Sequence, residues 1–325
     1  MIRYLIRRLL FALPILLGVN LITFALFFLV NSPDDMARMH LGDKRVSEAM
    51  VSKWKQDHGY DRPLVYAPEQ QGLDRFTETL FVQHSLRLFL LDFGRADDGR
   101  DIGADIRQRM GPSLAIAIPH LIVGLLVTIT LSLILAFFRA TYVDFVGVLL
   151  AVAMMSISSM FYIIGGQLVL GKLLNLTPIS GYLEGIEGFK FLITPILVGL
   201  VAGIGGGLRW YRTLFLEEIE KDYIRSARAR GLAESAVMFR HLLRNAMIPI
   251  LTGVVVVIPT LFMGSLITES FFSIPGLGSY TIDAIRGQDF AIVRAMVFLG
   301  SLLYIGGLIL TDISYVLADP RVRLE

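Results

Sequence analysis

Residue types that perform chemistry are absent or badly spaced in this sequence. There is no cysteine, which excludes a thiolate metal site, a cysteine nucleophile and a disulfide framework. No stretch has the spacing G-x-x-x-x-G-K-[ST], which would surround nucleotide phosphates with backbone N–H groups and a lysine. The histidines form no metal-ligand spacing such as H-E-x-x-H; they are His40, His58, His84, His120 and His241. We therefore expect no catalytic, cofactor-binding or metal-binding residue in this chain.

Ionisable residues inside apolar stretches are typical of ion-coupled carriers, and here they are few. Asp312 lies near the end of the last apolar stretch and Glu269 at the end of the fifth. Both can reach an interface or a basic neighbour, so we favour structural pairing over a proton relay. For His120, the one histidine in a charge-free stretch, we expect an interhelical hydrogen bond rather than a metal. The glycine-rich run 203–207 has no preceding strand and predicts close helix packing rather than nucleotide binding.

The segment 209–245 combines helix formers with small residues at helical spacing. Tyr223, Ala227 and Gly231 follow one another at i, i+4 and i+8 on one face. Small residues allow another surface to approach the backbone closely, and Gly231 can end the helix in a left-handed conformation before a second short helix from about Ala233. One interpretation is a protein-docking helix. The other is an amphipathic helix on anionic lipid, held by its arginines, and the residues alone leave both open.

A second irregular segment lies within 270–282, where Pro275, Gly276 and Gly278 interrupt an apolar stretch around Leu277. Irregular backbone at membrane depth persists only where protein or a cavity shelters it. We expect a re-entrant turn that helps to close the outer mouth of a pathway; a merely structural loop is the alternative.

The elements that must position these segments are apolar helices. The hydrophobic fraction is 54%, charged residues make up 18%, and mean hydropathy is +0.65, which excludes an ordinary soluble enzyme. A net charge of +2 is too small to suggest nucleic acid. About 20 apolar residues cross a bilayer, and six charge-free stretches approach that length. They are Leu9–Val30, Met110–Phe138, Phe145–Gly171, Phe191–Leu208, Asn245–Thr268 and Ala295–Thr311. The expected fold class is an all-α integral membrane protein with six transmembrane helices.

Charge in the short loops predicts the orientation. With the N-terminus inside, the inner side carries Arg3, Arg7, Arg8, Arg139, the eight basic residues between Arg209 and Arg244, Arg321 and Arg323. The short outer loops carry only Lys172, Lys190, Arg286 and Arg294. Basic residues favour the inner side, so we expect both termini inside. The predicted organisation is 1–30 (inner N-terminus and first helix), 31–109 (outer segment), 110–317 (core of five helices with the inner loop 209–245) and 318–325 (inner tail).

The outer segment 31–109 has structure of its own. Val46–His58, followed by Gly59, predicts a short helix with a glycine stop, and Leu73–Leu91 predicts a second helix. A small solvated cap on the first helix and a docking surface for an external partner both agree with this pattern.

The run DYIRSARARGL at 222–232 resembles the coupling-loop signature of ABC importer permeases, in the version of the dipeptide/oligopeptide (peptide/nickel) family. His241, the run RNA at 244–246 and Pro249 continue the resemblance. The general importer motif is partly kept: its opening residues fall on 225–227, and its Leu-Pro falls on Leu243-Arg244.

Other segments are similar to landmarks of these permeases in the same order. They are YDRPL at 60–64, DFG at 92–94, PISGY at 178–182, IPGLG at 274–278, DF at 289–290, Asp312 and ADPRVR at 318–323. The opening RYLIRRLL is similar to the first permease of the usual pair. One departure concerns an Ile-Pro-x-Phe turn of many relatives, where this chain has ISSM at 157–160; losing that proline removes a source of kinking.

The resemblance implies a type I ABC importer permease fold in the bacterial inner (cytoplasmic) membrane. The implied partners are a second homologous permease, two cytoplasmic ATPase subunits, a periplasmic substrate-binding protein and membrane lipid, with no nucleic acid. ATP and magnesium are then expected in the ATPase subunits, and no cofactor and no enzymatic activity in this chain.

Residue roles follow from the same resemblance. The implied ATPase-coupling residues are Tyr223, Arg225, Ala227, Arg228, Arg230, Gly231, Leu232 and Ala233, in a helical segment 222–241 that moves as a rigid lever. The implied outer gate is Pro275, Gly276, Leu277 and Gly278. Di- or oligopeptides are the implied cargo; nickel, glutathione, a peptide antibiotic or an oligosaccharide are alternatives. An ion-coupled secondary carrier and a membrane scaffold without transport are the rivals from other classes.

Overall fold

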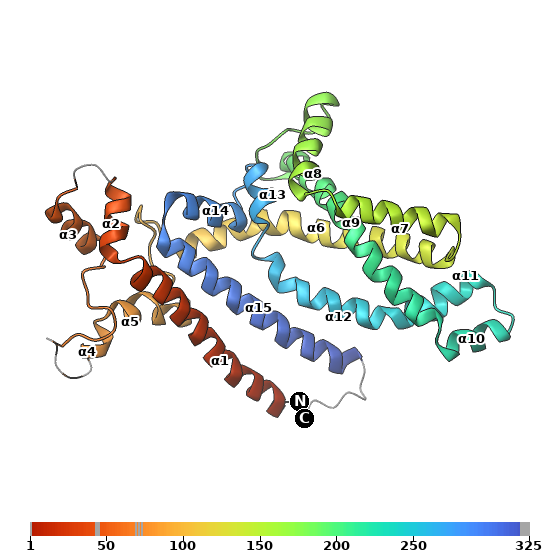
Figure 1. Cartoon of the computed structure of the whole chain (residues 1–325), viewed down its shortest axis with the longest axis horizontal. Coiled ribbons are helices and arrows are strands. Elements are labelled where there is room, and N and C mark those ends of the chain that lie inside the picture. The colour runs from red at the N-terminus through yellow and green to blue at the C-terminus, as the bar shows by residue number, and fades with distance from the viewer. Residues whose placement is uncertain (1, 43–45, 69, 71, 73, 319–325) are drawn as a thin grey trace. The chain divides into compact units, whose positions relative to one another are not determined.

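The computed structural model describes residues 2–42, 46–68, 70, 72 and 74–318. Its described part consists of helices joined by loops, with one isolated β-bridge between Arg95 and Asp101, so the all-α prediction is confirmed (Figure 1). Contacts divide the chain into two units. The first comprises the residues up to Arg109 together with 280–309, and the second comprises 110–279 together with the end of the last helix.

Five helical segments in the described residues are long and apolar enough to cross a membrane. They contain α1 (Ile2–Ala25) with the π-helical turn η1 (Leu26–Val30), α6 (Ile102–Phe137), the 3₁₀ turn η4 (Ile186–Gly188) with α9 (Phe189–Ile219), α12 (Leu243–Leu261) and α15 (Phe290–Ala318). The sixth expected span is a pair of helices bent by 90° at a short break. Six spans are therefore obtained only when this bent pair is counted as one.

The helix ends differ from the ends of the charge-free stretches. The second spanning helix begins at Ile102 rather than at Met110, because a helix continues past the hydrocarbon into charged sequence. The fifth ends at Leu261 rather than at Thr268, and the short helix α13 (Leu266–Phe271) follows separately. Gly264 between them has φ +69°, a left-handed conformation that ends a helix.

The bent pair consists of α7 (Tyr142–Met155) and α8 (Ser159–Gly166), which continues into the π-helical turn η3 (Gln167–Leu173). The sharp bend occurs without the proline of the related sequences, so the expectation that its loss removes the kink is wrong. Ser158 is extended (φ −62°, ψ 142°), and the Tyr162 hydroxyl donates to the Met154 carbonyl across the break at 2.9 Å. The Ile157 amide also donates to this carbonyl at 3.3 Å, so the Tyr162 hydroxyl adds a second hydrogen bond across the break.

The outer segment 31–109 contains short helices in the first unit. They are α2 (Pro33–Leu41), α3 (Glu48–Asp57), α4 (Asp74–Thr77), α5 (Leu80–His84) and the 3₁₀ turn η2 (Leu86–Leu90). The first predicted helix is confirmed as α3, and Gly59 behind it has φ +68°. A single helix over 73–91 is wrong: Thr79 is extended (φ −121°) and caps α5 with its hydroxyl. Leu73 itself lies outside the described residues.

An aromatic core gives the first unit its own stability. Buried Phe24, Phe28, Trp54 and Tyr60 pack together between α1 and the outer segment. The Arg294 guanidinium of α15 lies 4.6 Å from the Phe28 ring centroid and donates to the Tyr60 hydroxyl at 3.3 Å. The outer segment is therefore packed against α1 and α15 within this unit.

The second unit is built on close contact of α9 with α7 and with α6. A methyl group added at Gly205 would lie 2.5 Å from the Ala151 carbonyl oxygen, and one at Gly207 would lie 2.7 Å from the Thr128 side chain. These two glycines confirm the packing predicted for the run 203–207. The ring of His120 lies against Gly199 of α9, and the interhelical hydrogen bond expected for it is not found among the described residues.

Candidate coupling segment and outer turn

Residues 222–242, here called the coupling segment, fold as two short helices joined by a turn. They comprise α10 (Asp222–Ala229), α11 (Glu234–Ala236) and the π-helical turn η5 (Val237–Leu242), which continues into α12. Gly231 has φ +75° and its amide donates to the Arg228 carbonyl at 2.9 Å. The sequence-based prediction of a left-handed stop at this glycine is confirmed.

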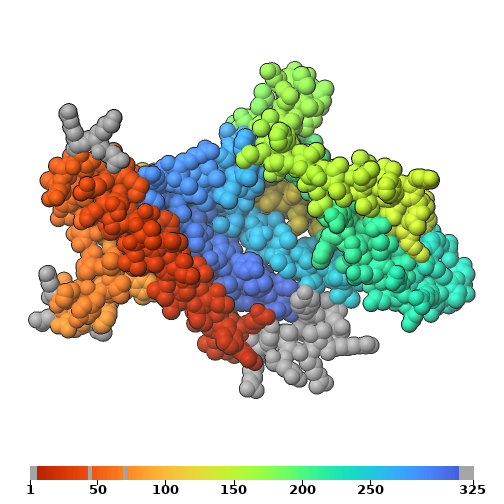
Figure 2. Space-filling view, in the orientation of Figure 1, coloured from red at the N-terminus to blue at the C-terminus, as the bar shows by residue number. Residues whose placement is uncertain are grey.

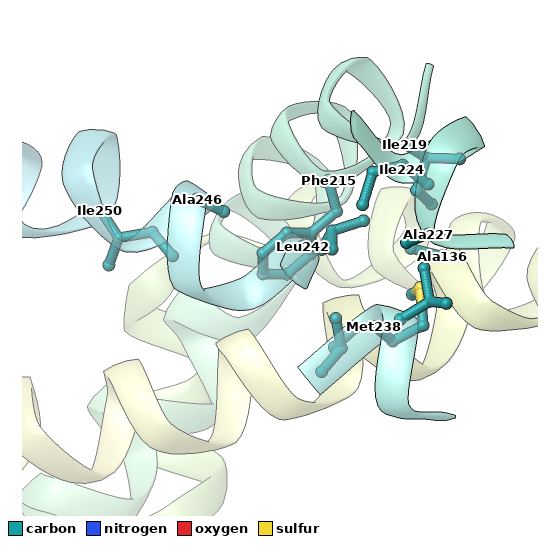
Figure 3. Packing of buried hydrophobic residues seen from close by; sticks show 11 residues of the cluster. Ala136, Phe215, Ile219, Ile224, Ala227, Met238, Leu242, Ala246 and Ile250 are labelled. Atoms are coloured by element: carbon teal, nitrogen blue, oxygen red, sulfur yellow. The ribbon is translucent and has the colours of Figure 1, made fainter. Parts of the chain in front are cut away.

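One face of the coupling segment is buried inside the protein. Ile224 and Ala227 are 0% exposed and pack against Phe215, Met238 and Leu242 of the neighbouring helices (Figure 3). The expectation that the small Ala227 lets a partner approach is therefore wrong. A small side chain stands at this position because α10 packs directly on the core of its own chain.

Tyr223 has a similar structural role at the edge of this core. Its side chain is half-buried and its hydroxyl donates to a carboxylate oxygen of Glu218. Burial, together with this acceptor, raises the pKa of the Tyr223 phenol. The hydrogen bond joins α10 to the end of α9.

The opposite face of the coupling segment is exposed. In Figure 2 the blue-green segment forms an uncovered surface at one end of the second unit. The exposed members of the predicted set are Arg225, Arg230, Gly231, Leu232 and Ala233. Arg228 is half-buried instead, and its guanidinium forms two hydrogen bonds with the Glu234 carboxylate, which closes the turn at Gly231.

Phe239 was missed by the sequence analysis, although its side chain is 64% exposed in the same segment. Its neighbours Val237, Met238 and Leu242 are buried, and Phe239 departs from their helical stripe. An aromatic residue off the apolar stripe and next to Arg240 is the signal that could have revealed it. The exposed face thus offers two large apolar side chains, Leu232 and Phe239, beside basic residues.

Residues 274–279, here called the outer turn, follow α13 and include the first residues of α14 (Leu277–Gly287). Pro275 is exposed, whereas Gly276, Leu277 and Gly278 are buried. A methyl group at Gly276 would overlap the Glu269 carboxylate, and one at Gly278 would lie 2.6 Å from the Ser265 carbonyl carbon. Both positions require glycine because another part of the chain approaches the backbone too closely for a side chain.

The outer turn encloses a buried acid. The Glu269 side chain is 1% exposed and accepts hydrogen bonds from the Ser113 hydroxyl and from backbone amides. Sequence analysis indicated structural pairing for this residue, by way of an interface or a basic neighbour. The structure gives it neutral donors instead, and the role of Ser113 had no signal in the sequence.

Two cavities accompany these segments. One of about 210 Å³ in the second unit is lined by Ser113, His120, Gly199, Thr260 and Glu269, among others. The other, of about 640 Å³ in the first unit, lies between the outer segment and the start of α15. Among the described residues no group of three or more histidine, aspartate or glutamate side chains is placed to hold a metal ion.

Several apolar spanning helices, interrupted by a helical segment with an exposed face, define a multi-pass membrane protein. Comparison with known families makes this class specific. Residues 113–324 match the family described as binding-protein-dependent transport system inner membrane component, and residues 1–86 match the N-terminal region of the same kind of component. The chain belongs to this family of ABC transporter permeases.

Relatives matched over nearly the whole of both chains agree with this assignment. The chain is 30% identical to the di/tripeptide transport system permease protein DppB of Pseudomonas aeruginosa (strain UCBPP-PA14), with 99% of each chain covered. It is 26% identical to the oligopeptide transport system permease protein AppB of Bacillus subtilis (strain 168), over 99% of this chain and 100% of that one. It is also 29% identical to the glutathione transport system permease protein GsiC of Salmonella choleraesuis (strain SC-B67), over the full length of both.

Proposed function

We propose that this chain is one of two permease subunits in an ATP-driven importer of di- or oligopeptides. The observation that carries the proposal is the coupling segment, which is anchored to the core on one face and exposed on the other. A segment with these two faces can receive motion from a partner and pass it to the spanning helices. The relatives named as peptide permeases support the cargo.

The exposed face suits an ATPase subunit. Leu232 and Phe239 supply apolar contact, and Arg225 and Arg230 supply charge at the rim, which is the usual division of labour in a protein interface. ATP and magnesium would be held by two such subunits on the inner side. The buried Ala227 and the hydrogen-bonded Tyr223 would not touch them; these residues would transmit the movement inside this chain.

The remaining partners would complete the transport cycle. A periplasmic binding protein would deliver the peptide to the outer side, and a second permease would form the other half of the pathway. Closure of the ATPases would shift the permease pair between outward-facing and inward-facing states, as a population shift driven by nucleotide. The outer turn would serve as part of the outer gate.

Uptake of a labelled dipeptide tests the function. Cells that lack the chain should lose uptake of labelled dialanine, and the plasmid-borne chain should restore it. Pull-down from these cells should recover ATPase subunits in stoichiometric amount. Normal dialanine uptake in the deletion strain, with its other peptide importers removed, would contradict peptide transport by this chain.

Glutathione is a second candidate cargo because the glutathione relative is as similar to this chain as the peptide relatives are. Competition separates the two. An excess of unlabelled glutathione should leave dialanine uptake unchanged if the importer takes ordinary peptides, and should suppress it if glutathione is the preferred cargo.

A further inference from the structure

Glu269 is a buried acid whose purpose the proposed function leaves open. Its Oε1 atom accepts from the Ser113 hydroxyl at 2.8 Å and from the Ser265 amide at 3.0 Å. Its Oε2 atom accepts from the Gly278 amide at 2.7 Å and from the Ser279 amide at 3.1 Å. One carboxylate therefore joins α6, the start of α13 and the outer turn, all within the second unit.

Ser113 makes the connection to α6 twofold. Its hydroxyl donates to Glu269 and at the same time accepts from the Leu277 amide at 2.8 Å. Both Ser113 and Glu269 are buried, and no ion pair of Glu269 with a described basic residue is present. The outer turn is thus attached to α6 by two polar side chains rather than by apolar packing alone.

The chemistry of the four donors requires a carboxylate. An ionised carboxylate offers acceptor sites on both oxygens, whereas an amide of the same shape replaces one oxygen with an N–H donor. Such an amide would direct its own N–H groups at backbone N–H groups on one side. Hydrogen bonds to a charged acceptor are also stronger than neutral ones, so the four donors offset part of the cost of burying this carboxylate without a counter-ion.

We propose that Glu269 is a positioning residue that holds the outer turn against α6, and that release of its hydrogen bonds accompanies opening of the outer gate. The second half of this inference rests on the proposed transport function; the first half does not. The buried glycines at 276 and 278 belong to the same arrangement, because they leave room for the carboxylate and the neighbouring backbone.

Spin-label distances in the assembled importer test the attachment. Native cysteine is absent, so Ser273→Cys and Ile118→Cys, both at exposed positions, place one label beside the outer turn and one on α6. The parent should give one narrow distance distribution. Glu269→Gln should broaden it and lower dialanine uptake about tenfold or more, since a charge-assisted hydrogen bond is lost. Glu269→Asp, which keeps the charge, should give a distribution width and an uptake between those of the parent and those of Glu269→Gln.

Controls separate the attachment from general damage. Glu217→Gln, the same change at an exposed position, should leave distances and uptake as in the parent. Ser113→Ala should broaden the distribution at normal amounts of assembled protein. A narrow distribution in both Glu269→Gln and Ser113→Ala would overturn the inference. The distance measurement needs no peptide, so it would report on the attachment even if the cargo were a different molecule.

Discussion

At the scale of single residues, burial decides which members of a sequence motif are free to bind a partner. Ala227 and Arg225 stand two residues apart in the same signature, yet Ala227 is buried in its own chain and Arg225 is exposed. A motif therefore combines positions that hold the segment together with positions that meet the partner. Substitutions must be chosen with that division in mind.

Ala227→Asp and Ala229→Asp form a matched pair on α10. Ala227→Asp places an unpaired charge in the core and should lower the free energy of unfolding by about 3–5 kcal/mol. Ala229→Asp introduces the same charge at an exposed site and should change it by less than about 0.5 kcal/mol. Limited proteolysis of the segment 222–242 in membranes compares the stability of the two variants. Equal sensitivity of the two variants would contradict the buried position of Ala227.

His84 makes the first unit sensitive to acid. Burial, with Arg294 nearby, lowers the pKa of its imidazole from 6.5 to about 3. Between these values the unfolded chain binds a proton that the folded chain does not, so stability is full above pH 6.5 and falls as the pH drops. The slope contributed by His84 is up to about 1.4 kcal/mol per pH unit.

Denaturant titrations of the detergent-solubilised chain at several pH values measure this effect. The unfolding free energy of the parent should fall from pH 6.5 towards pH 4, and His84→Gln should remove that part of the slope. The glutamine keeps a polar group near the Gly59 carbonyl, which His84 contacts at 3.4 Å. Identical slopes in the two proteins would show that this histidine titrates normally in the fold.

At the scale of secondary-structure elements, the break between α7 and α8 shows that a sharp bend does not depend on proline. The backbone at Ser158 already has the φ of −62° that a proline ring imposes, and its amide donates to no described residue. Proline at this position is therefore not needed for the bend in this chain.

Restoring the proline should therefore be tolerated. Ser158→Pro should leave thermal stability unchanged or raise it by about 0.4–1 kcal/mol, because proline restricts the unfolded chain. Ser156→Pro is the control: the Ser156 amide donates to the Val152 and Ala153 carbonyls, and its loss should cost about 3 kcal/mol. Comparable destabilisation by the two prolines would contradict the geometry described for the break.

The turn at Gly231 gives a second prediction at this scale. Open space surrounds the glycine, so Gly231→Ala meets no clash and costs only the left-handed strain of about 1–2 kcal/mol. Gly253→Ala, also in open space but inside α12, should instead be neutral or stabilising by up to about 1 kcal/mol. Thermal unfolding compares the two. ATPase recovery in pull-downs should fall for the first variant alone.

At the scale of the whole molecule, the sequence predicted the spanning helices well because transfer of apolar side chains into hydrocarbon is a local property of each stretch. It predicted the stop at Gly231 because the left-handed conformation of a glycine is also a local property of the chain. It did not predict that Ala227 packs inward on α10, nor the contact between Ser113 and Glu269. Those depend on residues far apart in the chain, whose proximity only the folded structure establishes.

The orientation of the whole chain in the membrane is a prediction. It rests on the excess of basic residues in the short loops of one side. Impermeant thiol reagents test it conveniently because the native chain has no cysteine. A cysteine at Ser52, exposed in α3, should be modified in intact cells, since 31–109 is expected outside. One at Ser235, exposed in the coupling segment, should be modified only after permeabilisation, because that segment must face the cytoplasm to meet an ATPase. Labelling of Ser235→Cys but not of Ser52→Cys in intact cells would invert the topology and would also remove the proposed site of ATPase docking.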